Sequence, residues 1–216
     1  MVSAIAKSFH PFYLFMAKNN TVTKECLENC LETFDGARST LILTPKEGTF
    51  LRSLAESGLE MVDCYHNDAV NFINAKDYVT AFAAINYSHA WIGCFNGLGL
   101  FDSNPGEELY KRLVPCDSEK CSTITDEKMA KYLDITTKAR KKLKIASPVR
   151  SFDRRLAIHF LDTSESYFKE AVDYRKENDY VRAFAAVNYA HAWLDGGARI
   201  GLFDVEEDDV LFTLYE

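Results

Sequence analysis

The chain has 216 residues, of which 47% are hydrophobic and 26% are charged, and its formal net charge is −7. This length allows one large domain or two of about 100 residues, with enough apolar residues for a sizeable core. The negative charge argues against nucleic acid as the main partner, because phosphate binding normally needs a basic surface. No apolar run reaches the roughly 18–20 residues of a membrane span.

Residues 1–20 contain a short apolar run from Pro11 to Ala17. Lys7, His10 and Pro11 interrupt the apolar character of this region, and no clear small-residue cleavage site is present. We therefore predict an N-terminal packing segment rather than a signal peptide. The six cysteines form no C-x-x-C pair and do not converge with histidines, which is typical of reduced thiols in a cytoplasmic protein without a metal site.

One stretch of sequence occurs twice. Residues 77–102 read DYVTAFAAINYSHAWIGCFNGLGLFD and residues 179–204 read DYVRAFAAVNYAHAWLDGGARIGLFD, with 16 of 26 positions identical at an offset of 102. Weaker matches at the same offset extend the unit to about 21–102 and 123–204. A duplicated unit of this size predicts two tandem copies of one fold.

Each copy predicts three helices. The first covers about 23–42 and 125–144, with Thr23 and Thr125 as N-caps. The second covers about 46–75 and 149–177, where Thr44-Pro45-Lys46-Glu47 offers a capping box and a proline in the first turn. Asp77 and Asp179 are expected to cap the third helix, and glycines at 97, 99, 196, 197 and 201 to end it.

The third helix is apolar on nearly every side, as AFAAINYSHAW shows. Such a helix is buried on more than one face, so we expect it to contact the other copy or another chain. No segment alternates with period two between hairpin turns, and we predict no sheet. The predicted fold is all-α, two tandem three-helix bundles at 21–104 and 123–216, joined by a linker at 105–122 with a short helix near 107–114. The acidic C-terminal tail either docks as a short segment or frays.

The second copy, with ITDEKMAKYLDITTKARKKLKIA followed by NDYVRAFAAVNYAHAWLDGGARIGLFD, resembles the archaeal family known as domain of unknown function 357. The first copy is similar to it less closely, because Gly93 stands where the second copy has Asp195 and Gly97 where it has Arg199. The resemblance implies a left-handed three-helix bundle of the immunoglobulin- or albumin-binding-domain type and an archaeal, cytosolic setting. It implies no established activity, cofactor or partner.

Two sets of residues are candidates for chemistry or binding. The first is a repeated polar set on the third helices, in which His would act as acid or base and Asn as its orienter, or both would satisfy buried carbonyls; its members are Asn86, His89, Asn188, His191, Asp195 and Arg199. Asp195 and Arg199, four residues apart, are expected to form a surface salt bridge, or Arg199 to hold an anion.

The second set is basic and could face an anionic partner, or form a solvated face opposite the acidic tail; its members are Lys138, Arg140, Lys141, Lys142, Lys144, Arg150, Arg154 and Arg155.

The repeated signature consists mostly of packing residues, so the sequence favours a protein–protein interaction or scaffold module, without cofactor or metal, over an enzyme. Self-association through the third helices is the partner that the apolar surface suggests. Two alternatives stay open: a small-ligand-binding protein or enzyme with a site around His191, Asn188 and Arg199, and a nucleic-acid-associated protein that uses the basic residues at 138–155.

Overall fold

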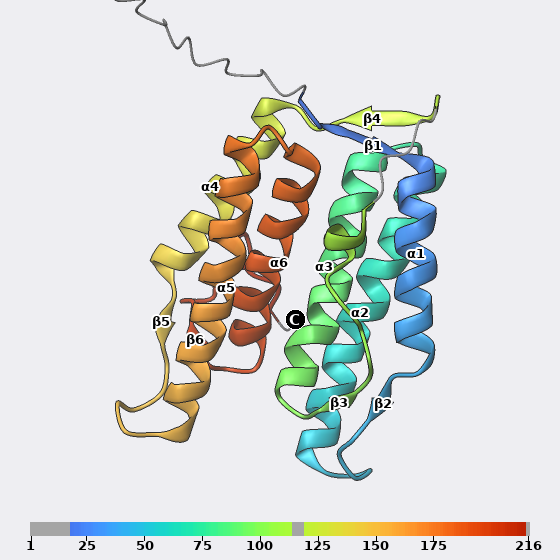
Figure 1. The fold of residues 1–216 in the computed structure, drawn as a ribbon. Coiled ribbons are helices and arrows are strands. Elements are labelled where there is room, and N and C mark those ends of the chain that lie inside the picture. The colour runs from blue at the N-terminus through green and yellow to red at the C-terminus, as the bar shows by residue number, and fades with distance from the viewer. Residues whose placement is uncertain (1–17, 114–118, 215–216) are drawn as a thin grey trace, which may run out of the picture.

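The computed structural model describes residues 18–113 and 119–214 (Figure 1). The packing segment predicted for residues 1–20 lies outside the described residues except for Lys18–Asn20. Within the described part, no helix combines the length and the hydrophobicity that a bilayer span requires.

The predicted all-α fold of two tandem three-helix units is confirmed. The first unit consists of α1 (Lys24–Ser39), α2 (Phe50–Asn74) and α3 (Tyr78–Gly97), and the second of α4 (Asp126–Lys142), α5 (Phe152–Lys176) and α6 (Tyr180–Arg199). The starts of equivalent helices are all 102 residues apart. The repeat seen in the sequence is therefore also a repeat of structure.

Helix starts follow the predicted caps at two of three positions in each unit. The side chains of Thr23, Thr125, Asp77 and Asp179 each accept a hydrogen bond from a backbone N–H in the first turn. The predicted start of the second helix is wrong. Thr49 and Ser151 are its caps, because Thr44 is held by the loop after α3, where its N–H donates to the Leu100 carbonyl at 3.1 Å.

The expectation of no sheet is also wrong, since three pairs of very short antiparallel strands occur among the described residues. β2 (Ile42–Leu43) pairs with β3 (Phe101–Asp102), and β5 (Lys144–Ile145) with β6 (Phe203–Asp204). β1 (Thr21–Thr23) pairs with β4 (Cys121–Thr123) across the two units. Strands of two or three residues are too short to show alternation in a sequence.

The pairing of β1 with β4 indicates a pseudo-twofold axis between the units. Thr21 lies opposite Thr123, its own repeat equivalent, in an antiparallel pair. The same relation recurs between the third helices: the rings of Tyr87 and His191 are 6.2 Å apart, and those of their equivalents Tyr189 and His89 are 5.9 Å apart. The two units thus face each other as an internal dimer.

Helices α3 and α6 lie side by side at the centre of the molecule (Figure 1). Nearly every residue of both helices is buried, and the prediction that the third helix contacts the other unit is confirmed. The glycine prediction holds at Gly99 and Gly201, which have φ of +69° and +77° and follow the C-cap residues of α3 and α6. It is wrong for Gly196 and Gly197, which lie inside α6.

The segments after β3 and β6 dock on this central pair. Residues Leu109–Arg112 form a short 3-10 helix, η1, close to the short helix predicted at 107–114, and its Tyr110 is fully buried. In the acidic tail, Val205 and Phe212 are buried, so the tail docks rather than frays.

Candidate functional site

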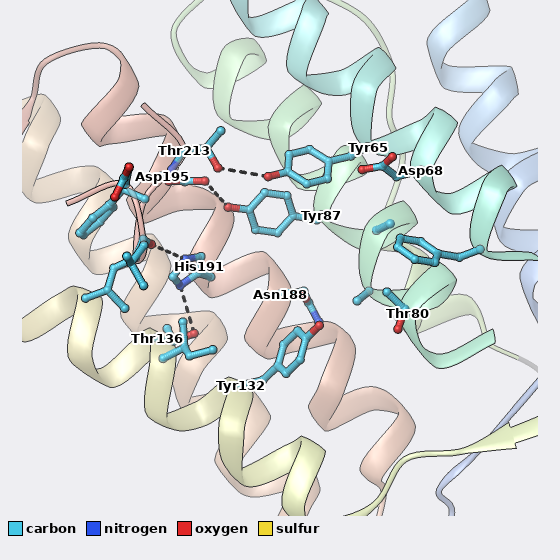
Figure 2. Close-up of a pocket in the computed structure, with 18 residues that line it drawn as sticks. Tyr65, Asp68, Thr80, Tyr87, Tyr132, Thr136, Asn188, His191, Asp195 and Thr213 are labelled. Atoms are coloured by element: carbon cyan, nitrogen blue, oxygen red, sulfur yellow. Dashed lines mark hydrogen bonds between the residues drawn. The ribbon is translucent and has the colours of Figure 1, made fainter. Parts of the chain in front are cut away.

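A pocket of about 320 Å³ lies where α3, α4 and α6 meet, closed on one side by α2 and on another by the C-terminal tail (Figure 2). Helices α3 and α2 contribute Thr80, Ala83, Ala84, Tyr87, Tyr65, Asp68 and Phe72. Helices α4 and α6 contribute Tyr132, Ile135, Thr136, Asn188, His191 and Asp195, and the tail contributes residues 209–213. This volume is at the small end of the range for ligand sites.

Helical periodicity explains why these side chains share one space. Thr80, Ala84 and Tyr87 recur at spacings of four and three on α3, so that they lie on one face. Asn188, His191 and Asp195 do the same on α6. In Figure 2 the labelled side chains of both helices and of Tyr132 and Thr136 surround the same gap. The small side chains of Ala83 and Ala84 leave the space that forms the pocket.

His191 faces the pocket with both ring nitrogens engaged. Its Nε2 lies 3.0 Å from the Leu211 carbonyl oxygen, and its Nδ1 lies 3.4 Å from Thr136 Oγ1. Burial lowers the pKa of His191, and the nearby charge of Asp195 opposes that shift only in part. Asn188 donates to the Phe184 carbonyl at 2.7 Å, one turn back in its own helix. These three contacts are typical of residues that satisfy buried polar groups.

Asp195 lies at the floor of the pocket and is 1% exposed. Its Oδ2 accepts a hydrogen bond from the Tyr87 hydroxyl, and its Oδ1 accepts one from the Thr213 N–H at 2.6 Å. Burial, reinforced by the charge of Asp195, raises the pKa of Tyr87 well above its ordinary value. Burial also raises the pKa of Tyr65, whose hydroxyl lies 3.1 Å from Thr213 Oγ1, to about 12. This network links α3 to α6 and holds the tail against α6 and α2.

The predicted surface salt bridge between Asp195 and Arg199 is wrong, because Asp195 is buried. The Arg199 Nε donates to Ser57 Oγ at 3.0 Å and its Nη1 donates to the Leu214 carbonyl at 3.3 Å. Arg199 therefore ties α6 to α2 and to the tail, away from the side chains that line the pocket.

The first-copy members of the polar set are not in the pocket. His89 Nε2 lies 3.1 Å from the Pro105 carbonyl oxygen, and its Nδ1 lies 2.7 Å from the Tyr189 hydroxyl. Asn86 donates to the Phe82 carbonyl at 2.8 Å. The structure thus brings together Asn188, His191 and Asp195, and places Asn86 and His89 on the opposite side of the α3–α6 pair.

The described part of the linker, residues 105–113, packs on that opposite side. We call the surface that it covers the linker groove; its residues are His89, Glu170, Tyr174, Arg182 and Tyr189. The ring of Tyr110 packs edge-on against Tyr189, with centroids 5.3 Å apart at 75°. Its hydroxyl donates to Glu170 Oε2 at 2.8 Å, and its main-chain carbonyl accepts from Arg182 Nε at 3.3 Å. A second ring, that of Tyr174, stands at 83° to it, 6.3 Å away. Tyr110 is therefore the anchor of the linker.

At the repeat offset of 102, the residues around Tyr110 correspond to residues that line the pocket. Four neighbours of Tyr110 have counterparts that all line the pocket: Tyr174 corresponds to Phe72, Glu170 to Asp68, Tyr189 to Tyr87 and Arg182 to Thr80. The alanines corresponding to Ala83 and Ala84 are Ala185 and Ala186, which are completely buried, whereas Ala83 and Ala84 are 6% and 7% exposed. The pocket is the counterpart of the place that Tyr110 occupies.

The C-terminal tail does not fill the pocket as the linker fills its groove, because its backbone follows a different course. Leu211 and Phe212 are the sequence counterparts of Leu109 and Tyr110. Phe212, however, packs beside His191, with ring centroids 6.5 Å apart, and the next residues turn to Asp195 and Arg199. Tyr110, Tyr65 and Tyr87 are not among the site residues predicted from the sequence. The 102-residue spacing of Leu109-Tyr110 and Leu211-Phe212 was the available signal.

The basic set lies along the end of α4, β5 and the start of α5, away from the pocket. Four of its members face carboxylates of the same chain: Lys138 and Asp134 at 2.6 Å, Arg140 and Glu165 at 2.5 Å, Lys142 and Asp208 at 2.6 Å, Lys144 and Glu206 at 2.5 Å. Lys141, Arg150 and Arg155 are exposed and Arg154 partly so. An anionic partner for this face stays a prediction. Across residues 18–113 and 119–214, no cluster of three His, Cys, Asp or Glu could hold a metal ion.

Comparison with known families matches residues 31–101 and 131–203 to a family described as "Protein of unknown function (DUF357)". No match was found among curated proteins or among solved structures. The two matched segments cover more than half of the chain, and each covers most of one structural unit. The chain therefore belongs to this family, of which it contains two tandem copies.

Proposed function

We propose that the protein is an interaction module that binds a polypeptide segment by inserting an aromatic side chain of that segment into the pocket. The observation that supports the proposal is the anchoring of Tyr110 in the linker groove, at the pseudo-symmetric position. The pocket offers an aromatic ring in Tyr87, a second ring in Phe72 and a carboxylate in Asp68, as the linker groove does with Tyr189, Tyr174 and Glu170. An aromatic anchor in a pre-formed pocket is a common centre of protein interfaces.

The polar groups of the pocket favour binding over catalysis. A general base needs a nitrogen or carboxylate within reach of a substrate proton. Here the nitrogens of His191 face Leu211 and Thr136, and both oxygens of Asp195 accept hydrogen bonds. The hydroxyl nearest to His191 is that of Thr136, which is only 1% exposed and lies 3.4 Å from Nδ1, at the long end of hydrogen-bond distance.

The linker itself supplies a probe for the experiment. A synthetic peptide with the sequence of residues 105–113, PGEELYKRL, is titrated into the full chain while the methyl groups of Ala83 and Ala84 are followed by NMR. We expect saturable shifts of both methyl groups at millimolar or lower peptide concentration. The same peptide with alanine in place of tyrosine should bind at least tenfold more weakly, because it lacks the ring that fills the pocket.

A pair of variants locates the site. Ala84→Leu places a larger side chain in the pocket and should weaken binding of the peptide at least tenfold. Ala130→Leu makes the same change at an exposed position of α4 and should leave binding unchanged. Equal affinity of both variants, or no saturable shift at any concentration, would show that the pocket does not receive a tyrosine side chain.

A further inference from the structure

The proposed function leaves open which segment supplies the aromatic side chain, and the pseudo-twofold axis points to a segment of this chain. In the linker groove the occupant is the stretch of chain that leads into β4. The strand that the axis relates to β4 is β1. The stretch that leads into β1 is residues 1–20, which correspond at an offset of 102 to residues 103–122.

The described end of this stretch is fixed at the starts of two helices that line the pocket. Lys18 Nζ lies 2.7 Å from Asp126 Oδ1 and 4.0 Å from the centre of the Tyr180 ring. The Asn19 N–H donates to the Asn178 carbonyl at 2.9 Å. Asp126 and Tyr180 begin α4 and α6, the two helices that form one wall of the pocket. From Asp126 to Tyr132 of the pocket wall is about 9 Å along α4, since an α-helix rises 1.5 Å per residue.

The length of the segment is sufficient. Tyr110 lies eleven residues before Cys121, the first residue of β4, and eleven residues before the equivalent Asn19 is Ser8, next to Phe9. Seventeen residues precede Lys18. An extended chain covers about 3.3 Å per residue, so that even six residues from Lys18 span about 20 Å.

The composition of the segment is complementary to the pocket. Residues 9–15 contain four aromatic side chains, Phe9, Phe12, Tyr13 and Phe15. Residues 1–20 contain two lysines and no acidic residue, whereas Asp68 and Asp209 line the pocket. In the linker groove, Arg182 donates to main-chain carbonyls of the linker. Its counterpart in the pocket is Thr80, and Lys128, whose Nζ donates to Thr80 Oγ1 at 2.8 Å, places a cation at this end of the pocket.

We propose that residues 1–17 of this chain occupy the pocket, with a ring from residues 9–15 at the position that corresponds to Tyr110. The inference rests on the proposed function, because it names the ligand of the same pocket. The C-terminal tail and residues 1–17 would then together cover the pocket side of the α3–α6 pair, as the linker alone covers the opposite side. A partner segment would bind by displacing residues 1–17, and these residues act as an intramolecular competitor.

The test compares three full-length proteins: the wild type, a variant with Phe9, Phe12, Tyr13 and Phe15 all changed to Ser, and a control with Phe50→Ser and Phe152→Ser. Phe50 and Phe152 are repeat equivalents that are 84% and 69% exposed, so the control removes apolar surface far from the pocket. Without any ligand, we expect the methyl resonances of Ala83 and Ala84 to move in the N-terminal variant and not in the control. The resonances of Ala185 and Ala186 should stay unchanged, which also reports that the fold is intact.

The peptide PGEELYKRL is then titrated into all three proteins. We expect at least tenfold higher affinity for the N-terminal variant than for the wild type and the control. Equal affinity for all three, with unmoved Ala83 and Ala84 methyl groups, would overturn the inference and leave the proposed function intact. Methyl shifts on substitution without binding of the peptide to any of the three would support the intramolecular occupant and refute binding of segments supplied from outside.

Discussion

The hydroxyl of Tyr87 donates to the buried carboxylate of Asp195 and joins the two units by a bond that has no symmetric counterpart. The equivalent of Tyr87 is Tyr189, and the position equivalent to Asp195 is Gly93. Tyr189 turns to His89 and to the Leu109 N–H of the linker instead. The difference between Gly93 and Asp195 is thus one of those that distinguish the groove that receives the linker from the pocket bordered by the tail.

Asp195→Ala should destabilise the protein by about 3 kcal/mol, because it leaves the Tyr87 hydroxyl and the Thr213 N–H buried without their acceptor. Asp195→Asn keeps a carbonyl oxygen and should cost less. Urea unfolding at pH 7 gives both values. A free energy of unfolding of the alanine variant within 0.5 kcal/mol of the wild type would contradict the role of this carboxylate.

Phe184→Ala should cost about 3–5 kcal/mol, as large truncations in a packed core do. Phe184 is completely buried in α6, and the ring of Tyr132 lies 4.5 Å from its own. Phe50→Ala removes a ring that is mostly exposed and should change the free energy of unfolding by less than about 0.5 kcal/mol. Similar midpoints for the two variants in thermal or urea melts would refute the assignment of the core.

The two units exchange a large and a small residue at one place in the core. Gly58 of α2 lies against Phe95 of α3, and an added Cβ would meet that ring at 2.2 Å. The sequence equivalents are Phe160 and Gly197, in reverse order, and an added Cβ at Gly197 would meet the ring of Phe203 at 2.2 Å. Gly58→Ala should therefore cost about 1–3 kcal/mol through overpacking.

The double variant with Gly58→Phe and Phe95→Gly should be more stable than the sum of its single changes allows, which a double-mutant cycle measures. Additive losses would contradict the exchange.

The protein should lose stability between pH 7 and pH 5 in part through His89. Burial lowers the pKa of His89, whose Nδ1 lies 2.7 Å from the Tyr189 hydroxyl. The carbonyl of Pro105 and Glu108 act in the opposite direction, and Arg112 adds to the lowering. Below about pH 6.5 the unfolded chain binds a proton at this histidine that the folded chain does not bind. The stability is therefore complete above this pH and falls as the pH decreases.

A His89→Gln variant lacks this proton and isolates its effect. The wild type should lose up to about 2 kcal/mol more than the variant between pH 7 and pH 5, at about 1.4 kcal/mol per pH unit. His191 is present in both proteins, so its own titration cancels in the difference. Parallel stability curves for the two proteins over this range would refute a neutral, buried His89.

The sequence predicted the architecture well because the features that specify it are local or periodic. Thr23, Thr125, Asp77 and Asp179 cap helices as their side-chain chemistry predicts. The all-apolar third helix had to be buried on several sides, and it is. Thr44 failed as a cap because its hydrogen bonds go to the loop around Leu100, fifty-odd residues away, which no local pattern can show.

The pocket could not be predicted for a similar reason. His191 and Asn188 were recognised as a polar pair, but their partners come from α4 and the tail. The sequence predicts Asp195 at the surface, because its acid–base spacing with Arg199 is typical of exposed helices. Its partner Tyr87 is 108 residues away in sequence. Only the three-dimensional arrangement shows that a linker tyrosine and a pocket occupy equivalent places.

The most direct measurement of the central claim is the binding of p-cresol, the side chain of tyrosine as a free molecule, followed at the alanine methyl groups. We predict saturable shifts at Ala83 and Ala84 in the wild type or in the variant with serines at residues 9, 12, 13 and 15, with little change at Ala185 and Ala186, where Tyr110 is already in place. Toluene should bind more weakly, because it has no hydroxyl for Asp68 to accept from. Absence of saturable shifts at Ala83 and Ala84 in both proteins would contradict the equivalence of the pocket and the Tyr110 site.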